Sequence, residues 1–64
     1  MFFAVLDENN IVINTIVCDD VETAELVTGK TCIEYEEATE ENIDQGKTAA
    51  NGFKWNGTKF EQPE

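Results

Sequence analysis

The sequence predicts an α+β fold, with a small, mainly antiparallel β-sheet, one short helix on a face of the sheet, and a β-hairpin at the C-terminus. Three observations favour this class. Two apolar runs, at residues 2–6 and 11–17, flank a short polar turn, which is typical of a hairpin. An aspartate pair and a glycine bracket residues 21–28, which is typical of a helix. An Asn-Gly pair between aromatic residues at 53–60 indicates a second hairpin.

The run from Ile11 to Val17 is the longest apolar stretch and the richest in β-branched residues. Such residues fit a pleated, partly buried surface, so this run is predicted to lie in the middle of the sheet. Residues 2–6 are predicted to pair with it through a turn at residues 7–10, whose residue types favour turns. Both strands carry apolar residues on both faces. We therefore expect one face to pack on a helix and the other on a further layer or a partner chain.

The helix is predicted to begin after Asp19 or Asp20, because an aspartate at the N-cap accepts hydrogen bonds from unpaired amides. Glu22 follows Asp19 at the spacing of a capping box, and Gly29 fits the left-handed position just past the helix end. So short a helix is unstable alone, so its apolar side is expected to pack on the sheet and Glu22 and Glu25 to point outward. This apolar side is predicted to consist of Val21, Ala24, Leu26, Val27 and Thr28.

Residues 31–36 alternate as a half-exposed strand does. Ile33 and Tyr35 are predicted to lie on one side, and Cys32, Glu34 and Glu36 on the other. Its pairing is open: the order strand, helix, strand allows a parallel crossover, but the short connection equally allows an antiparallel pair. Residues 36–52 form an acidic connection with few apolar groups. Within it, Thr39 is predicted to open a short helix that Gln45 and Gly46 close, and residues 47–52 are predicted to be a loop.

The C-terminal hairpin is predicted to turn at Asn56-Gly57, the preferred two-residue type I′ pair. With that turn, Trp55 would lie opposite Thr58 and Phe53 opposite Phe60, which would place an aromatic pair across the hairpin. Four aromatic residues are candidates for an interface, where such side chains are enriched, although a small core needs them too. These are Phe53, Trp55, Phe60 and Tyr35.

The 64 residues predict a single domain, 1–64, with a marginal core that a disulfide, a metal or a partner would help to stabilise. Fourteen acidic residues oppose four lysines, with no arginine and a net charge of −10. Because arginine is the usual reader of phosphate and guanine, no nucleic-acid partner is expected, and an anionic membrane would repel the chain. No export signal or membrane span is recognisable. Cys18 and Cys32 are therefore expected to stay reduced, as small buried hydrophobes.

Catalysis and cofactor binding find little support in the sequence. The chain has neither histidine nor serine, so a Ser-His arrangement is excluded, and no cofactor is expected. The acidic residues between Glu34 and Asp44 do not have the spacing of a calcium loop, and two cysteines without histidine do not make a zinc site. Solvated surface charge is the favoured interpretation of the acids. We therefore expect a protein that is not an enzyme.

Three segments together resemble small structural and accessory proteins of tailed bacteriophages, including those of cyanobacteria. They are the hairpin Phe2–Val17 with its Asn-Thr-Ile-Val run, the Asp-rich helix start at 19–27, and Gly52–Phe60 close to a terminal proline. The resemblance covers most of the chain except residues 36–51. It implies a virion component, either a capsid decoration (cement) protein or a tail or baseplate accessory, with no catalytic residues to carry over. The implied location is the virion, and the host cytoplasm during assembly.

The expected function is therefore to bind other virion proteins, capsid or tail, through exposed strand edges or the aromatic hairpin, and also to form a homo-oligomer. A second class stays open. A chain this acidic is also suited to mimic DNA and inhibit a host or phage DNA-binding protein. Salt distinguishes the two, because binding driven by charge weakens steeply as salt rises and an apolar contact does not.

Overall fold

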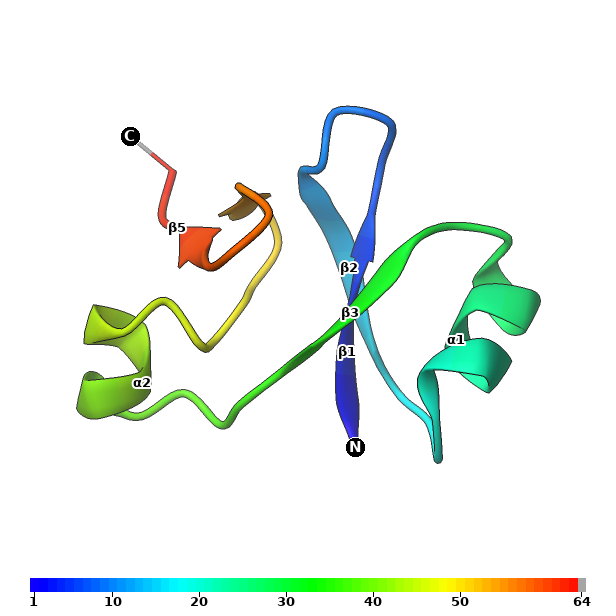
Figure 1. The fold of residues 1–64 in the computed structure, drawn as a ribbon, viewed down its shortest axis with the longest axis horizontal. Helices are drawn as coiled ribbons and strands as arrows, with labels where there is room; N and C mark the ends of the chain where they lie inside the picture. Colours follow the sequence, from blue (N-terminus) through cyan, green and yellow to red (C-terminus); the bar gives the residue numbers. More distant parts are fainter. Residues whose placement is uncertain (64) are drawn as a thin grey trace.

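A computed structural model describes residues 1–63 of the chain. It confirms the α+β class, since within this range a three-stranded antiparallel sheet, a two-stranded sheet and two short helices are present (Figure 1). In chain order the elements are β1 (Phe2–Leu6), β2 (Val12–Val17), α1 (Val21–Thr28), β3 (Cys32–Tyr35), α2 (Glu40–Asp44), β4 (Lys54–Trp55) and β5 (Phe60–Glu61).

The first strand, not the second, lies in the middle of the larger sheet, whose order is β2-β1-β3. The prediction that residues 11–17 form the central strand is therefore wrong. Residues 3–6 of β1 are all buried because both of its faces are covered, whereas Ile13 and Val17 of β2 are 43% and 70% exposed. The β-branched run of β2 thus forms an edge strand, and the shorter apolar run of β1 beside it is covered on both faces.

The first hairpin is confirmed, with β1 and β2 antiparallel around the predicted turn. Asp7 organises this turn, since its Oδ1 accepts two turn amides, including that of Ile11 at 3.0 Å. The register shifts between Val5 and Leu6, which leaves Ile13 without an opposite residue. Such a bulge reverses which backbone groups face the neighbouring strand. Beyond the bulge, β2 therefore offers its backbone to a different partner, described below.

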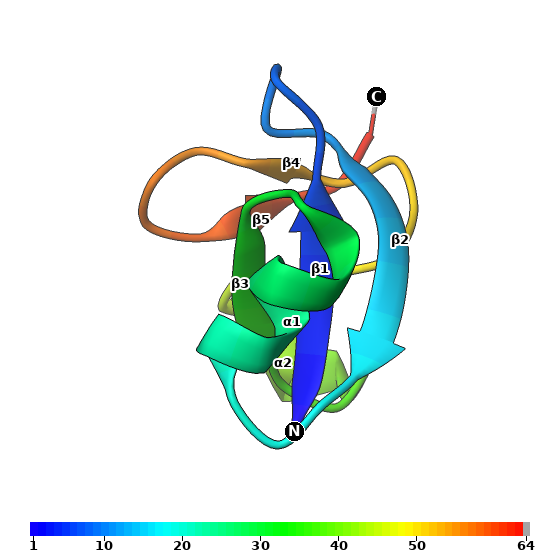
Figure 2. The same cartoon turned by 90° about the vertical axis from the view of Figure 1, so that its right-hand side faces the viewer.

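Helix α1 carries the chain from β2 across β1 to β3 (Figure 2). β3 pairs antiparallel with β1, and because β2 is also antiparallel to β1, β2 and β3 run parallel to each other. The connection through α1 is therefore a crossover between parallel strands that passes over β1, while the direct pairing of β3 is antiparallel. Asp20 is the N-cap of α1, and its Oδ1 accepts the Thr23 amide at 2.7 Å. The predicted capping box of Asp19 and Glu22 is wrong, because with Asp20 as the cap the third helical residue is Thr23. Gly29 ends the helix in the left-handed region, as predicted.

The side of α1 that packs on the sheet is narrower than predicted. Ala24 is fully buried and Thr28 is half-buried, but Leu26 and Val27 are 84% and 73% exposed and Val21 is 41% exposed. At about 100° per residue, Ala24 and Thr28 share one side of a helix and Leu26 lies nearly opposite. The predicted packing of Leu26 and Val27 on the sheet is therefore wrong. The helix docks through its small residues and turns its largest apolar side chain to solvent.

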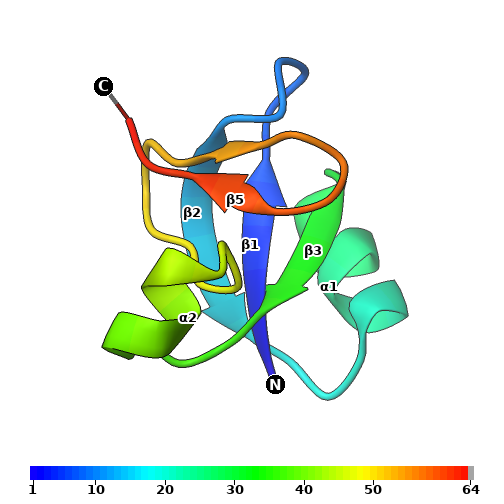
Figure 3. The same ribbon diagram turned by 60° about the vertical axis from the view of Figure 1, so that its left-hand side comes forward.

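The sheet forms the middle of three layers, with α1 on one face and the C-terminal hairpin with α2 on the other (Figures 1 and 3). The cluster on the helix side consists of Phe3, Val5, Ala24 and Cys32, with Ile16 and Cys18 packed against it. The cluster on the other side consists of Ala4, Leu6, Val12, Ala49 and Phe60, with Ile33, Tyr35, Phe53 and Trp55 packed against it. This confirms that the first hairpin has a helix on one face and a further layer on the other.

The C-terminal hairpin is present, but its predicted register is wrong. Trp55 lies opposite Phe60, and the loop between them comprises residues 56–59. A type I′ turn needs positive φ at both central residues, and here Gly57 has it while Asn56 does not. Instead, Oδ1 of Asn56 accepts the amide hydrogens of residues 58 and 59, both at 2.9 Å. The longer loop makes Trp55 and Phe60 the aromatic pair, with ring centroids 4.7 Å apart.

The acidic connection contains α2, as predicted, with Thr39 as its N-cap and Gly46 in the left-handed region after its end. The loop that follows is not simply a surface loop, because Thr48 and Ala49 are buried in the core. The small size of Ala49 fits the space under the hairpin. Nothing in the alternation of this stretch marked these two residues as interior positions.

Backbone hydrogen bonds join all five strands into a closed ring. Beyond the pairs within the two sheets, β2 bonds to the residue before β4. In addition, β5 bonds to the glycine that follows α2, and the residue after β3 bonds to the next residue of that loop. These three links are Val12 N–H to Phe53 O at 2.8 Å, Phe60 N–H to Gly46 O at 2.8 Å, and Glu36 N–H to Lys47 O at 2.7 Å. The bulge in β2 makes the first link possible by turning Val12 outward.

Candidate protein-binding surface

Several large apolar side chains stay exposed in the folded chain. They are Met1, Phe2, Ile13, Val17, Val21, Leu26, Val27 and Ile43. Scattered exposed apolar residues are ordinary, but contiguous ones mark interaction sites. On α1, Thr23, Leu26 and Val27 stand at the spacing i, i+3, i+4, so they share the outer side of the helix. We call these three residues the helix patch.

The outer edge of β2 is largely closed. Near its start, Val12 exchanges hydrogen bonds with the chain before β4, donating to Phe53 O and accepting from the Gly52 amide, both at 2.8 Å. Further along, the outward amide of Thr15 donates to Oδ1 of Asn14 at 2.9 Å. A free strand edge can pair with the strand of another molecule, and these contacts reduce the number of free backbone groups on this edge.

The outer edge of β3 is closed at both ends by other parts of the fold. Leu6 N–H donates to Thr31 O at 2.9 Å, so in an antiparallel ladder the odd-numbered residues of β3 bond to β1 and the even-numbered ones face outward. The Cys32 amide donates to Oε2 of Glu25 at 3.1 Å. The Glu36 amide donates to Lys47 O. Glu25 is exposed, as predicted, and its carboxylate in addition covers part of this strand edge.

Glu34 is the open position on this edge. Its N–H and C=O face outward, and within residues 1–63 neither has a hydrogen-bond partner. A hollow lies on either side of Glu34. One, on the α1 side, has a volume of about 420 Å³, and we call it the helix-side hollow. The other, of about 340 Å³, is lined also by Trp55 and Lys47, and we call it the hairpin-side hollow. The open backbone of Glu34 therefore lies between two recesses.

The four aromatic candidates divide between the core and these recesses. Phe60 is 5% exposed and belongs to the core, and Phe53 packs against the same cluster half-buried. Trp55 is half-buried and lines the hairpin-side hollow. Tyr35 packs half-buried against the same core cluster and contacts Phe2, with ring centroids 5.7 Å apart and ring planes tilted by 32°. The structure thus brings Trp55 and Phe60 together, and a role of the four at an interface stays a prediction.

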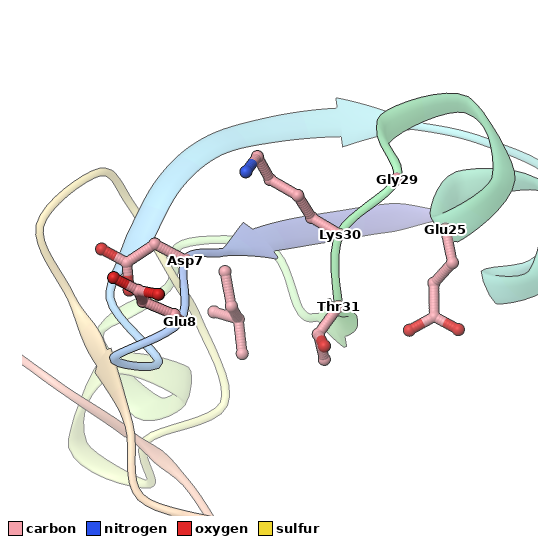
Figure 4. A pocket seen from close by; sticks show the side chains of 7 residues that line it. Asp7, Glu8, Glu25, Gly29, Lys30 and Thr31 are labelled. Atoms are coloured by element: carbon pink, nitrogen blue, oxygen red, sulfur yellow. The ribbon is translucent and has the colours of Figure 1, made fainter.

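A third hollow, of about 530 Å³, lies between the turn after β1 and the α1–β3 connection (Figure 4). Asp7 and Glu8 stand at one end and Glu25 at the other, with Lys30 between them. Asp7 and Glu25 already accept backbone amides, as described above. Glu25 stands apart from Asp7 and Glu8, and the carboxylates of Asp7 and Glu25 serve to hold the turn and the strand edge.

The other side chains that could take part in chemistry, Asp20 and the two cysteines, make contacts that stabilise the fold. The Thr23 backbone N–H, followed by the Thr23 hydroxyl, holds the pKa of Asp20 below its ordinary value, because both hydrogen bonds favour the carboxylate. Cys18 and Cys32 are free thiols; Cys32 is buried, as expected, whereas Cys18 is only half-buried. Among residues 1–63, no three histidine, cysteine or acidic side chains gather as metal ligands would.

No helix within residues 1–63 is long and apolar enough to cross a membrane. Comparisons with protein-family models, with curated proteins and with solved structures find no match to the chain. The residues named above are therefore interpreted from their own geometry and chemistry.

Proposed function

We propose that this chain is a non-enzymatic structural or accessory component of a tailed-phage virion, and that it binds another virion protein, of the capsid or the tail. The helix patch is the observation that supports protein binding. Leu26 and Val27 are 84% and 73% exposed on the outer side of a helix that the chain itself leaves uncovered. Burying such side chains against a partner is favourable by roughly 25 cal/mol per Å² of apolar surface.

The virion part of the proposal rests on the sequence resemblance of the hairpin 2–17, the helix start 19–27 and the segment 52–60. The absence of serine and histidine from the sequence supports a role without catalysis. A homo-oligomer is part of the same proposal, with the helix patch of a second copy as one available partner. Its place of action is then the particle, and the host cytoplasm during assembly.

The first experiment is mass spectrometry of particles purified on a gradient from the source. We expect the chain at constant stoichiometry in the particles: many copies would place it on the shell, and few copies in the tail or neck. Absence from particles combined with abundance in the infected-cell lysate would overturn the proposal. A salt-sensitive complex with a DNA-binding protein in that lysate would instead establish the acidic-inhibitor function.

The helix patch itself is tested by Leu26→Lys in the virus. This change places a charge in the proposed contact, so we expect incorporation into particles to fall at least about tenfold while the fold is retained. Asn51→Lys is the matched control, because it adds the same charge at an exposed position of the loop before β4, on the other face of the sheet. Equal incorporation of the two variants would remove the helix patch from the contact.

A further inference from the structure

We infer that the outer edge of β3 is a second binding site, which accepts an extended, basic segment of a partner protein as an additional strand centred on Glu34. This site is separate from the helix patch, and it holds or fails independently of any place in a virion. The inference combines three features of the edge, namely its single open backbone position, the recesses on both sides, and the charges around them.

The backbone feature selects a short extended ligand. Cys32 N–H is occupied by Glu25 and Glu36 N–H by Lys47, so Glu34 is the position where a visiting strand can both donate to and accept from β3. The Cys32 carbonyl, which also faces outward and has no partner within residues 1–63, offers one further acceptor. A peptide of a few residues satisfies these groups, whereas the closed ends of the edge stop a long strand from continuing. Main-chain hydrogen bonds of this kind provide affinity in strand addition.

The recesses select the side chains. Successive side chains of a strand point to opposite faces of a sheet, and Cys32 and Glu34 lie on the α1 face. The peptide residue that pairs with Glu34 therefore directs its side chain towards the helix-side hollow. Its two neighbours direct theirs towards the opposite face, where the hairpin-side hollow and Trp55 lie. An edge with a recess on each face is thus suited to read alternate residues of a bound strand.

The charges select a cation at the central residue. The helix-side hollow has apolar walls formed by Met1, Phe3, Val21 and Cys32. It is also lined by the exposed acidic residues Asp19, Asp20 and Glu34. A lysine or arginine matches this combination, because its aliphatic stem contacts apolar walls while its charged end reaches carboxylates. The neighbouring residues, facing Trp55, are expected to be apolar or β-branched.

A second copy of this chain does not meet this description. With a net charge of −10 and four lysines, two copies repel each other at an acidic edge. The apolar-Lys-apolar triplet of the chain, Phe53-Lys54-Trp55, is already engaged with β2 and β5. The ligand is therefore a segment of a different protein, with a lysine or arginine between apolar or β-branched residues.

The test uses the full chain labelled with ¹⁵N and a blocked pentapeptide, Thr-Val-Lys-Val-Thr, titrated at low salt. We expect the Glu34 amide signal to shift most and its hydrogen exchange to slow at least about tenfold, because a free edge amide becomes hydrogen-bonded. The Glu counterpart, Thr-Val-Glu-Val-Thr, is expected to bind at least about tenfold more weakly, and the difference to shrink as salt rises. An unperturbed Glu34 amide at millimolar Lys peptide overturns the inference, as does equal binding of both peptides.

Two substitutions at Glu34 separate the backbone from the charge. Glu34→Pro removes the outward N–H of residue 34 but no hydrogen bond to β1. Because proline is tolerated on strand edges, we expect the fold to persist. Peptide binding is expected to fall at least about tenfold, because the peptide loses a hydrogen-bond donor. Val17→Pro is the matched control, because by the same alternation it removes an outward N–H from the other edge strand, and binding should persist. Glu34→Gln is expected to keep the amide protection while reducing the preference for lysine over glutamate.

Unchanged peptide binding in Glu34→Pro would overturn strand addition. Should that variant fail to fold, the exchange of the Glu34 amide in the unaltered chain decides the question. Detection of the chain in particles does not depend on any of these results, so the failure of this site and the failure of the virion proposal are distinguishable.

Discussion

Gly46 carries a constraint that no other residue type meets. It has a φ of 71°, and a Cβ placed there would lie 2.6 Å from Cβ of Lys59, beside the link from Gly46 O to Phe60. Gly46→Ala is expected to destabilise the fold by clearly more than the roughly 1 kcal/mol of a left-handed alanine. Urea unfolding measures this. Gly29→Ala is the control, with a similar φ of 68° and nothing within 4 Å, and equal losses in the two variants would contradict the close contact.

Thr48 is a buried residue whose hydroxyl has no hydrogen-bond partner within residues 1–63. An unsatisfied buried polar group is unfavourable, so the isosteric Thr48→Val is expected to stabilise the chain by about 1 kcal/mol in thermal or urea unfolding. Thr28→Val makes the same chemical change where the hydroxyl donates to Ala24 O at 2.8 Å, and it is expected to destabilise. A loss of stability in Thr48→Val would mean that the hydroxyl is satisfied in solution.

At the scale of the element, α1 depends on its cap. Oδ1 of Asp20 accepts the Thr23 amide, and the hydrogen bonds from Thr23 lower the pKa of Asp20 below its ordinary value of 3.8. Since the folded pKa is the lower one, the carboxylate stabilises the fold above pH 3.8, and this contribution is lost as the pH falls through the folded value. Asp20→Ala is therefore expected to lower the melting temperature at neutral pH and to make little difference in strong acid.

The measurement for this helix is a series of circular-dichroism melts from neutral to acid pH. Asp19→Ala is the control, because Asp19 is an exposed neighbour that does not cap the helix. A gap between Asp20→Ala and the unaltered chain that persists in strong acid would show that the loss is not due to the ionised cap.

The same element shows why its packing face was mispredicted. The apolar residues of α1 are spread around the helix, and periodicity alone cannot say which of them face a sheet. The helix-side surface is already filled by Phe3 and Val5, so the small Ala24 makes the contact and Leu26 does not. The cap and the final glycine were predictable, because they are set by local hydrogen bonding and local φ.

At the scale of the whole molecule, the ring of backbone hydrogen bonds leaves few free strand edges that could pair with a second molecule. Glu25 covers part of one such edge, on β3. Glu25→Ala frees the Cys32 amide and lengthens the open edge of β3 from one outward amide to two. We expect association that rises with concentration in sedimentation velocity. Glu22→Ala removes the same charge from α1 without an edge contact and is expected to behave as the unaltered chain does. Identical sedimentation of both variants would contradict the prediction that Glu25 prevents association through the edge of β3.

The candidate site was visible in the sequence only in part. The alternation of residues 31–36 predicted a strand with Cys32 and Glu34 on one side, and the structure confirms this for β3. The open state of Glu34 was not predictable, because it depends on Glu25 reaching Cys32 and on Lys47 reaching Glu36. Both contacts join segments that are separate in the chain, and no local pattern encodes them.

The sequence by itself determined the α+β class, the first hairpin, the glycine that ends α1, the Thr39 cap of α2 and the existence of an aromatic hairpin. It left the cap of α1 open between Asp19 and Asp20. Each of these depends on interactions between residues a few positions apart. Tertiary structure decided that β1 is central, that Leu26 faces solvent, that Trp55 pairs with Phe60, and that the strands close into a ring through Gly46 and Lys47. These outcomes depend on which surfaces compete for a small core, and that competition is resolved only when the whole chain is packed.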